Sequence, residues 1–331
     1  MKKRIITLGE VMLRLSTPGH HRFVNASSFE VVYGGAEANV AVSLANWNCS
    51  VAHVSALPNH EIGDAVKRYL RSSGVDTSYL QFSPGRMGLY FVENGAMQRS
   101  SRIIYDRFDS VFANFDFSKL DWDQIFQGAD WFHWTGITPA ISASAAKVCK
   151  EAVLAAEKLG VKISADINYR RNLWQYGKQP LEIMPELIRP SHLIIAGLTD
   201  FENCMGIQTD NYEEACQAAK EFCPNLAYVS TTSRKSISAS ENKLKGKLWN
   251  TEEFLKSKSY RMSHIVDRIG GGDAFMAGLI YGLLHFSDQE AIDFAVAASV
   301  LKHSIPGDAN LVSIEEVNHL IKGENVGKLL R

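Results

Sequence analysis

The stretch Asp267-Arg-Ile-Gly-Gly-Gly-Asp-Ala-Phe275 places three successive glycines and one aspartate before an apolar run that continues to Leu284. Glycine has no side chain, so a turn of three glycines leaves its backbone N–H groups unshielded. The apolar run predicts a helix, and a helix N-terminus adds positive partial charge. The short run Ile265–Val266 before the turn predicts a strand. Together they indicate a strand-to-helix turn that can bind a phosphate or a transferring phosphoryl group.

Asp273 follows the glycines directly. A carboxylate at this position can accept the proton of a substrate hydroxyl while the neighbouring N–H groups hold a phosphoryl group. Aspartate near a helix start is also a common N-cap residue. The pattern taken by itself therefore leaves both a catalytic and a capping role open for Asp273.

Outward from this turn, apolar strand-like runs alternate with amphipathic helical stretches. The expected strands of the later chain are Trp131–Trp134, Val161–Ala165, His192–Ala196 and Leu226–Ser230, and the expected helices include Ser142–Leu159 and Tyr212–Phe222. The earlier chain has expected strands at Ile5–Leu8, Val51–Ala56, Met87–Val92 and Ser101–Tyr105, with helices at Ala36–Trp47 and Glu61–Ser73. This alternation predicts an α/β fold with a mainly parallel central sheet and helices on both faces.

Two segments interrupt the alternation, at about residues 10–33 and 86–107. We expect them to form a small β-sheet that acts as a lid over the ligand edge of the main sheet. A plain edge extension of the main sheet is the alternative. Since no repeat or linker divides the sequence, we expect one domain over residues 1–331.

Composition excludes several classes of protein. The 331 residues carry 35 Lys and Arg against 36 Asp and Glu, which does not indicate a nucleic-acid-binding surface. The five cysteines are scattered, as is typical of reduced thiols in the cytoplasm. No apolar run approaches the roughly 18 residues that cross a membrane. Glu10 and Arg14 interrupt the first apolar run, so it predicts a strand rather than a signal peptide.

A second glycine-containing segment lies near the N-terminus, Tyr33-Gly-Gly-Ala-Glu-Ala-Asn-Val-Ala-Val-Ser-Leu-Ala45. By itself it is also compatible with a tight turn into a core helix. The two segments together resemble the signatures of the ribokinase (PfkB) family, where the C-terminal one is typically D-T-x-G-A-G-D-x-F and the N-terminal one G-G-x-x-x-N-x-A. Arg268 and Gly271 differ from the commonest form. The resemblance covers essentially the whole chain and implies a ribokinase-like three-layer α/β/α fold.

The resemblance also implies roles for particular residues. Asp273 would be the catalytic base, and Gly270, Gly271 and Gly272 the anion hole. The N-terminal segment would bind the sugar through Gly34, Gly35, Ala36 and Asn39. The implied reaction is transfer of the ATP γ-phosphoryl group to a sugar hydroxyl with the help of Mg²⁺, and a monovalent cation such as K⁺ is a further candidate cofactor.

Three features are similar to family members that phosphorylate 2-keto-3-deoxygluconate. They are the GGAEAN variant, the Tyr105-Asp-Arg107 element, and the stretch Asp166-Ile-Asn-Tyr-Arg-Arg-Asn-Leu-Trp174. A planar guanidinium can bind the carboxylate of this sugar acid through two hydrogen bonds, and Arg107 and Arg170 are the candidates. Each arginine could instead form a surface ion pair. Tyr90 and Tyr105 would contact the substrate.

On the nucleotide side, the family loop after Leu226–Ser230 has a T-x-G-x-x-G character. The corresponding residues 231–236 contain no glycine. The nucleotide-binding candidates implied by position are Asn168, Thr231, Ser233, Arg234, Gly270, Gly272 and Asp308. The family's N-x-x-E metal motif corresponds to Gly197-Leu-Thr-Asp200, so Asp200 is a candidate for holding Mg²⁺ through water, or a helix cap.

Several functions remain open at this point. The leading one is 6-phosphorylation of 2-keto-3-deoxygluconate in the cytoplasm, and a kinase for a neutral sugar such as fructose or ribose is the alternative. The altered Gly197 position also allows a catalytically impaired sugar-binding homologue. A dinucleotide-dependent oxidoreductase is disfavoured because no G-x-G-x-x-G follows the first strand. Exposed lid strands would favour a homo-oligomer formed through the lid, and no nucleic-acid or membrane partner is expected.

Overall fold

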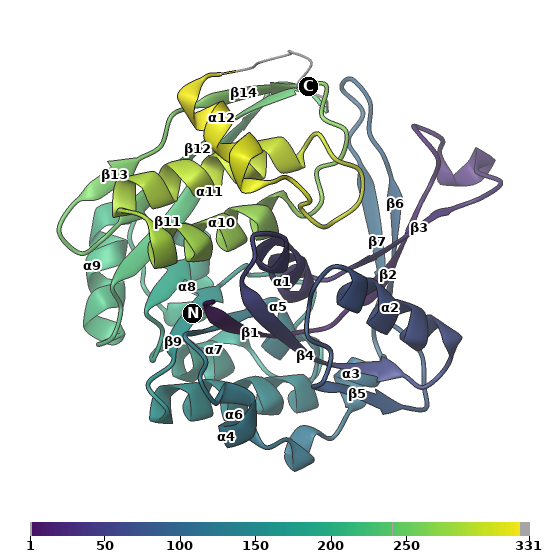
Figure 1. The fold of residues 1–331 in the computed structure, drawn as a ribbon, viewed down its shortest axis with the longest axis horizontal. Coiled ribbons are helices and arrows are strands. Elements are labelled where there is room, and N and C mark those ends of the chain that lie inside the picture. The colour runs from purple at the N-terminus through teal and green to yellow at the C-terminus, as the bar shows by residue number, and fades with distance from the viewer. Residues whose placement is uncertain (1, 240, 325–331) are drawn as a thin grey trace.

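The computed structural model describes residues 2–239 and 241–324 and shows a sheet covered by helices on both faces (Figure 1). The strands of the large sheet lie side by side in the order β13 (Phe254–Lys256), β12 (Glu241–Trp249), β11 (Tyr228–Ser236), β10 (Leu193–Ile195), β9 (Lys162–Asp166), β8 (Trp131–Thr135), β1 (Arg4–Leu8), β4 (Ser50–Pro58) and β5 (Leu80–Ser83), and β14 (Tyr260–Ser263) pairs with β12. Pairing is parallel from β11 to β5 and antiparallel beyond β11. The predicted mainly parallel α/β sheet is confirmed.

Neighbouring residues of one strand supply two separate hydrophobic cores, because successive side chains point to opposite faces. Ile6 of β1 packs into the core under the helices α3 (Val111–Asn114), α4 (Trp122–Phe126), α5 (Ile137–Ile141), α6 (Ala143–Lys158), α7 (Pro180–Ile188), α8 (Leu198–Met205) and α9 (Tyr212–Phe222). Ile5 packs into the core under α1 (Ala36–Asn46), α2 (Glu61–Ser72), α10 (Gly271–His285), α11 (Asp288–Lys302) and α12 (Ile314–Lys322). Two short 3-10 helices cover Phe23–Asn25 and Phe117–Lys119.

A second, smaller sheet stands beside the large one, and its strands β2, β3, β6 and β7 lie on the right in Figure 1. Its order is β3 (Glu30–Gly34), β2 (Met12–Ser16), β6 (Leu89–Glu93) and β7 (Arg102–Asp106). β2 and β6 are parallel, and the outer pairs are antiparallel. The small separate sheet that the sequence predicted is therefore present, rather than an extension of the main sheet.

Two local predictions were wrong. Residues 231–236 are not a loop: β11 continues to Ser236 and pairs with β12 as far as Asn242. The run Ile265–Val266 is not a strand, because β14 ends at Ser263 and an irregular segment leads into α10. Ile265 and Val266 are β-branched residues, which are common in strands, but here they lie in the irregular segment before the glycine turn.

No helix among the described residues is long and apolar enough to cross a membrane. The five cysteines are all buried as free thiols.

Candidate active site

A cavity of about 730 Å³ opens where the strands β1, β9 and β10 of the large sheet end, with the small sheet on its other side. Glu10 lies just after β1, Asp166 ends β9 and Ala196 follows β10, and all three line this cavity. The carboxyl edge of a parallel sheet is where open α/β folds bind ligands. The cavity joins the residues of both glycine segments, which lie far apart in the sequence.

The glycine turn forms the N-terminus of α10. Gly270 is the residue before the helix and has φ +80°, a left-handed conformation that favours glycine. A Cβ atom on Gly270 would lie 1.8 Å from the backbone oxygen of Asp308, so the chain also approaches too closely for any side chain. Gly272 faces open space instead. The turn therefore presents bare N–H groups at a helix start, as an anion site requires.

Asp273 lies in the first turn of α10 and faces the cavity. The side-chain amide of Asn39, from α1, donates to its carboxylate at 2.7 Å. Burial raises the pKa of Asp273 to about 7, with smaller contributions from the charges of Asp308 and Glu37. Gly270 occupies the N-cap position, so Asp273 does not cap the helix. A carboxyl group whose pKa lies near neutrality is suited to general-base catalysis.

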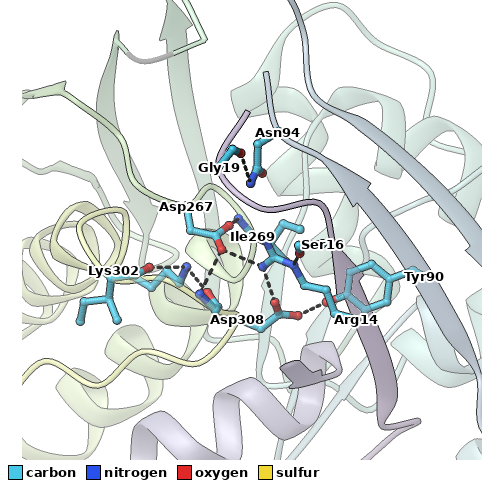
Figure 2. A network of polar contacts seen from close by, with 11 residues as sticks. Arg14, Ser16, Gly19, Tyr90, Asn94, Asp267, Ile269, Lys302 and Asp308 are labelled. Atoms are coloured by element: carbon cyan, nitrogen blue, oxygen red, sulfur yellow. Dashed lines mark hydrogen bonds and ion pairs between the residues drawn. The ribbon is translucent and has the colours of Figure 1, made fainter. Parts of the chain in front are cut away.

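A buried polar network connects the small sheet to the glycine turn (Figure 2). Arg14 of β2 contacts the carboxylates of Asp267 and Asp308 at 2.8 Å each. Tyr90 of β6 donates to Asp308, and Asp267 accepts from the backbone N–H groups of Ile269 and Gly307. These contacts fix the turn relative to two strands of the small sheet.

Lys302 of α11 lies beside this network and is fully buried. Its ammonium group donates to the backbone oxygens of Gly307 at 2.6 Å and Ile305 at 3.4 Å. Burial lowers the pKa of Lys302, while the charges of Asp267 and Asp308 act in the opposite direction. The lysine thereby holds the segment that carries Asp308.

The N-terminal glycines pack against the same network. A Cβ atom on Gly34 would lie 2.1 Å from a carboxylate oxygen of Asp308, and one on Gly35 would lie 2.1 Å from the backbone oxygen of Glu10. Both positions therefore require glycine because neighbouring atoms already fill the space. Gly35, Ala36 and Asn39 line the cavity, whereas Gly34 does not belong to its lining residues. Sugar binding by this segment stays a prediction.

The two candidate arginines for the substrate carboxylate differ in their surroundings. Arg107 is buried, and its Nε and Nη2 both donate to Glu10 Oε2, at 2.9 and 2.6 Å. Ser110 donates to the other oxygen of Glu10 at 2.5 Å. Arg170 is exposed at the cavity wall. Arg107 is thus held by an internal carboxylate, whereas Arg170 is available to a ligand.

The aromatic candidates lie together on the small sheet. The rings of Tyr90 and Tyr105 stack with their centroids 5.8 Å apart, and both residues line the cavity. Tyr90 is buried and Tyr105 is exposed. The two rings form an aromatic part of the cavity wall.

The nucleotide-side candidates are only partly gathered at the cavity. Asn168, Thr231 and Arg234 line it, whereas Ser233 does not belong to its lining residues. Asp308 lines it from the side of the small sheet, where Arg14 and Tyr90 contact its carboxylate. The geometry thus brings Asp308 against Gly34 of the N-terminal glycine segment.

Asp200 caps a helix and also lines the cavity. Its carboxylate accepts from the backbone N–H groups of Gly197 at 2.7 Å and Tyr169 at 2.9 Å, which caps the start of α8. It also lines the cavity near Asp166, whose pKa burial and the charge of Asp200 raise. No cluster of three or more metal-binding side chains occurs within residues 2–239 and 241–324. Mg²⁺ commonly keeps several waters and uses one or two carboxylates plus substrate phosphates, so Asp166 and Asp200 fit it.

Sequence reasoning missed several residues that line or support the cavity, namely Glu10, Arg14, Asp166, Arg268 and Lys302. Glu10 and Asp166 could have been found, because polar residues at the carboxyl ends of parallel strands gather at one edge. Arg14 and Lys302 gave no such signal, since their partners lie in distant parts of the chain.

The family pattern described as pfkB family carbohydrate kinase matches residues 2–314, so the chain belongs to this family of kinases. The crystal structure of 2-dehydro-3-deoxygluconokinase from Thermotoga maritima is 39% identical, with a TM-score of 0.91 over 97% of this chain and 100% of that one. A 2-dehydro-3-deoxygalactonokinase of Haloferax volcanii is 29% identical over 99% of both chains. A structure from E. coli described as ribokinase II, with ATP and Mg²⁺, is 19% identical with a TM-score of 0.82 over 98% of this chain and 100% of that one, and shows the same fold.

Proposed function

We propose that this kinase transfers the γ-phosphoryl group of ATP to the 6-hydroxyl of 2-keto-3-deoxygluconate, giving 2-keto-3-deoxy-6-phosphogluconate. The observation that carries the proposal is the position of Asp273 beside the bare glycine turn, in one cavity with Arg170 and the sugar-side residue Asn39. The relative from Thermotoga maritima, which is 39% identical, is named 2-dehydro-3-deoxygluconokinase, which is the activity proposed here.

Each residue of the site has its own role in the proposed reaction. Asp273 takes the proton of the 6-hydroxyl as that oxygen forms a bond to the γ-phosphorus, and the bond from the γ-phosphorus to the bridging oxygen of ADP breaks. Gly270, Gly271 and Gly272 hold the charge of the transferring group with their N–H groups. Asp166 and Asp200 would hold Mg²⁺ through water, and the ion would neutralise phosphate charge. Asn39 orients the Asp273 carboxylate.

The sugar acid would be recognised at its other end. Arg170 is free to bind the substrate carboxylate, and Arg107 can contribute the N–H groups that Glu10 does not use. The small sheet would act as a lid, with Tyr90 and Tyr105 covering the substrate and excluding water. Asn168, Thr231, Ser233 and Arg234 remain candidates for nucleotide contact. Whether K⁺ is required stays a prediction, which rates measured in potassium and tetramethylammonium salts test.

A screen of ATP consumption tests the substrate. It should include 2-keto-3-deoxygluconate, its C4 epimer 2-keto-3-deoxygalactonate, aldonates, fructose and ribose. The epimer is a second candidate because a relative 29% identical over 99% of this chain is named for it. We expect turnover of one or both ketodeoxy acids and little of the neutral sugars. Faster turnover of fructose or ribose would refute the acid-sugar assignment, and no turnover with any acceptor would favour a binding protein.

The outer face of the small sheet supports association of two copies through it. Successive strands align Val31, Leu15, Phe91 and Ile104 in one apolar row across this face. Val31 is 55% and Ile104 54% exposed. Such a row on a sheet surface marks an interface, and a second copy would cover it by two-fold symmetry. Light scattering at micromolar concentration should show a dimer that Ile104→Glu dissociates, and a monomeric wild type would contradict this.

The five buried free thiols support a reducing, cytoplasmic location. The absence of nucleic-acid and membrane partners stays a prediction from the balanced charge of the chain.

A further inference from the structure

Five arginines line or support the cavity, and they differ in how their charges are compensated. Arg170 lies exposed at the cavity wall. Arg14 contacts Asp267 and Asp308, and Arg107 contacts Glu10. Arg234 and Arg268 also line the cavity, yet within the described part of the chain neither forms an ion pair with a carboxylate.

The polar contacts of these two arginines are with neutral groups. Arg268 donates from Nε to the backbone oxygen of Ala239 at 3.0 Å and from Nη2 to that of Ser238 at 2.7 Å. Nη2 of Arg234 lies 3.3 Å from Nε2 of His303, and the pKa of this histidine is lowered to about 4, mainly by burial. Both guanidinium groups are therefore held in place by neutral groups, and no contacting carboxylate neutralises their positive charge.

Their position relative to the glycine turn follows from the same contacts. A Cβ atom on Gly271 would lie 2.5 Å from the His303 ring, so this ring packs directly against the turn. Arg234 contacts Nε2 of the same ring. Arg268 stands two residues before Gly270. The two cations thus flank the anion-binding turn.

The arrangement has an electrostatic cost. Burial lowers the pKa of Arg234, and the positive charge of Arg268 lowers it further. Arg234 is exposed and Arg268 half-buried. Like charges held close together at a cavity wall repel each other unless an anion lies between or beside them. Such arrangements are typical of sites that bind a charged ligand.

Both arginines stand where the chain departs from the usual family pattern. Thr is common at the position of Arg268, and a glycine-containing loop is usual where Arg234 lies. Here that segment is strand β11, whose residues pair one by one with β12 from Val229 to Ser236. The segment thus forms a continuous strand, and two guanidinium groups supply positive charge at the same wall of the cavity.

We propose that Arg234 and Arg268 together bind the phosphate tail of the nucleotide, in place of the glycine loop of related kinases. The guanidinium fork fits two phosphate oxygens at once, and each such charge-assisted hydrogen bond is stronger than a neutral one. This proposal rests on the proposed ATP-dependent function, and it adds the residues that recognise the polyphosphate.

Calorimetric titration with ADP, ATP and adenosine, without sugar, tests the proposal. The variants are Arg234→Gln and Arg268→Thr, the latter giving the residue common in the family. Hydrogen bonds to charged groups contribute about 1.5–3 kcal/mol, so each variant should weaken ADP binding by about ten- to hundredfold. Adenosine has no phosphate, so its affinity should not change. Lys235→Gln is the matched control, because Lys235 lies on the same strand but points to the other face.

The outcomes separate this proposal from the kinase function. If ADP affinity is unchanged in both variants while the wild type turns over ATP, the arginines have no phosphate role and the kinase function stands. If adenosine affinity falls as much as ADP affinity, the arginines only shape the site and the proposal is also overturned. Arg234→Lys and Arg268→Lys keep the charge and should restore part of the ADP affinity. A wild type that binds no nucleotide would instead refute the ATP-dependent function itself.

Discussion

The side-chain amide of Asn39 donates a hydrogen bond of 2.7 Å to the carboxylate of Asp273, although the two residues are 234 positions apart in the sequence. The contact joins α1, which follows Gly34 and Gly35, to α10, which begins at the turn of three glycines. The amide leaves the other carboxylate oxygen for a substrate hydroxyl. In the proposed reaction, binding of the acceptor and positioning of the base therefore depend on one contact between helices.

Replacement of Asp273 by Asn should remove the proton acceptor. General-base catalysis contributes about 10²- to 10⁴-fold to rates, so kcat should fall by that factor. KM for the sugar should change little, because the amide can still accept a hydrogen bond from the hydroxyl. Steady-state kinetics measure both values. A kcat within about tenfold of the wild-type value would contradict the role of Asp273 as base.

Activity should depend on pH through the same residue. Burial raises the pKa of Asp273 to about 7, and only the ionised carboxylate can take a proton. The rate with sugar should therefore decline as the pH falls below about 7, with one proton bound. A profile of kcat/KM against pH measures this, and a rate that stays constant well below this pH would contradict it.

The raised pKa of Asp273 also has a stability consequence. Between its ordinary value of 3.8 and about 7, the folded state retains a proton that the unfolded state has released. The free energy of unfolding should therefore fall as the pH rises through this range. In the Asp273→Asn variant no carboxyl group titrates at this position, so its free energy of unfolding does not decrease for this reason. The stability of the variant relative to wild type should therefore increase with pH up to about 7. Urea unfolding at several pH values checks the difference, and a constant difference would contradict it.

Replacement of Arg170 by Ala should weaken binding of the sugar acid selectively. Loss of a charge-assisted hydrogen bond should raise KM for 2-keto-3-deoxygluconate by about ten- to hundredfold. KM for ATP should not change. Arg171→Ala is the matched control, because Arg171 is also exposed but does not line the cavity. Equal effects of the two substitutions would remove the carboxylate-binding role of Arg170.

Gly271 and His303 should be coupled in stability. A Cβ atom on Gly271 would lie 2.5 Å from the His303 ring, so Gly271→Ala should destabilise the protein although Ala is common there in the family. Overpacking of this kind costs about 1–3 kcal/mol. His303→Ala should make the alanine tolerable, so a double-mutant cycle should show a coupling of about 0.5–3 kcal/mol. Additive effects on the free energy of unfolding would contradict the contact.

The sequence was sufficient for the parts of the site that local patterns determine. The alternation of strands and helices and the glycine turn followed from periodicity and from residues near one another in the chain. The role of Asp273 as base was implied by the family resemblance, because the local pattern also allowed a helix cap. Arg14, Lys302 and the pairing of Arg107 with Glu10 could not be predicted, because their partners come from distant segments that only folding brings together. Residues 231–236 were misassigned because the family loop suggested a turn, while pairing with β12 extends the strand.

The contacts of Arg14 also constrain how the molecule is made. Asp267 and Asp308 are synthesised long after Arg14, so a growing polypeptide that ends before Asp308 contains the three glycines and Asp273 but has only one of the two carboxylates that Arg14 contacts. A buried guanidinium that loses a partner in this way is costly. The candidate active site therefore forms only after Asp308 has been synthesised. Chains that terminate before Asp308 should be inactive rather than partly active.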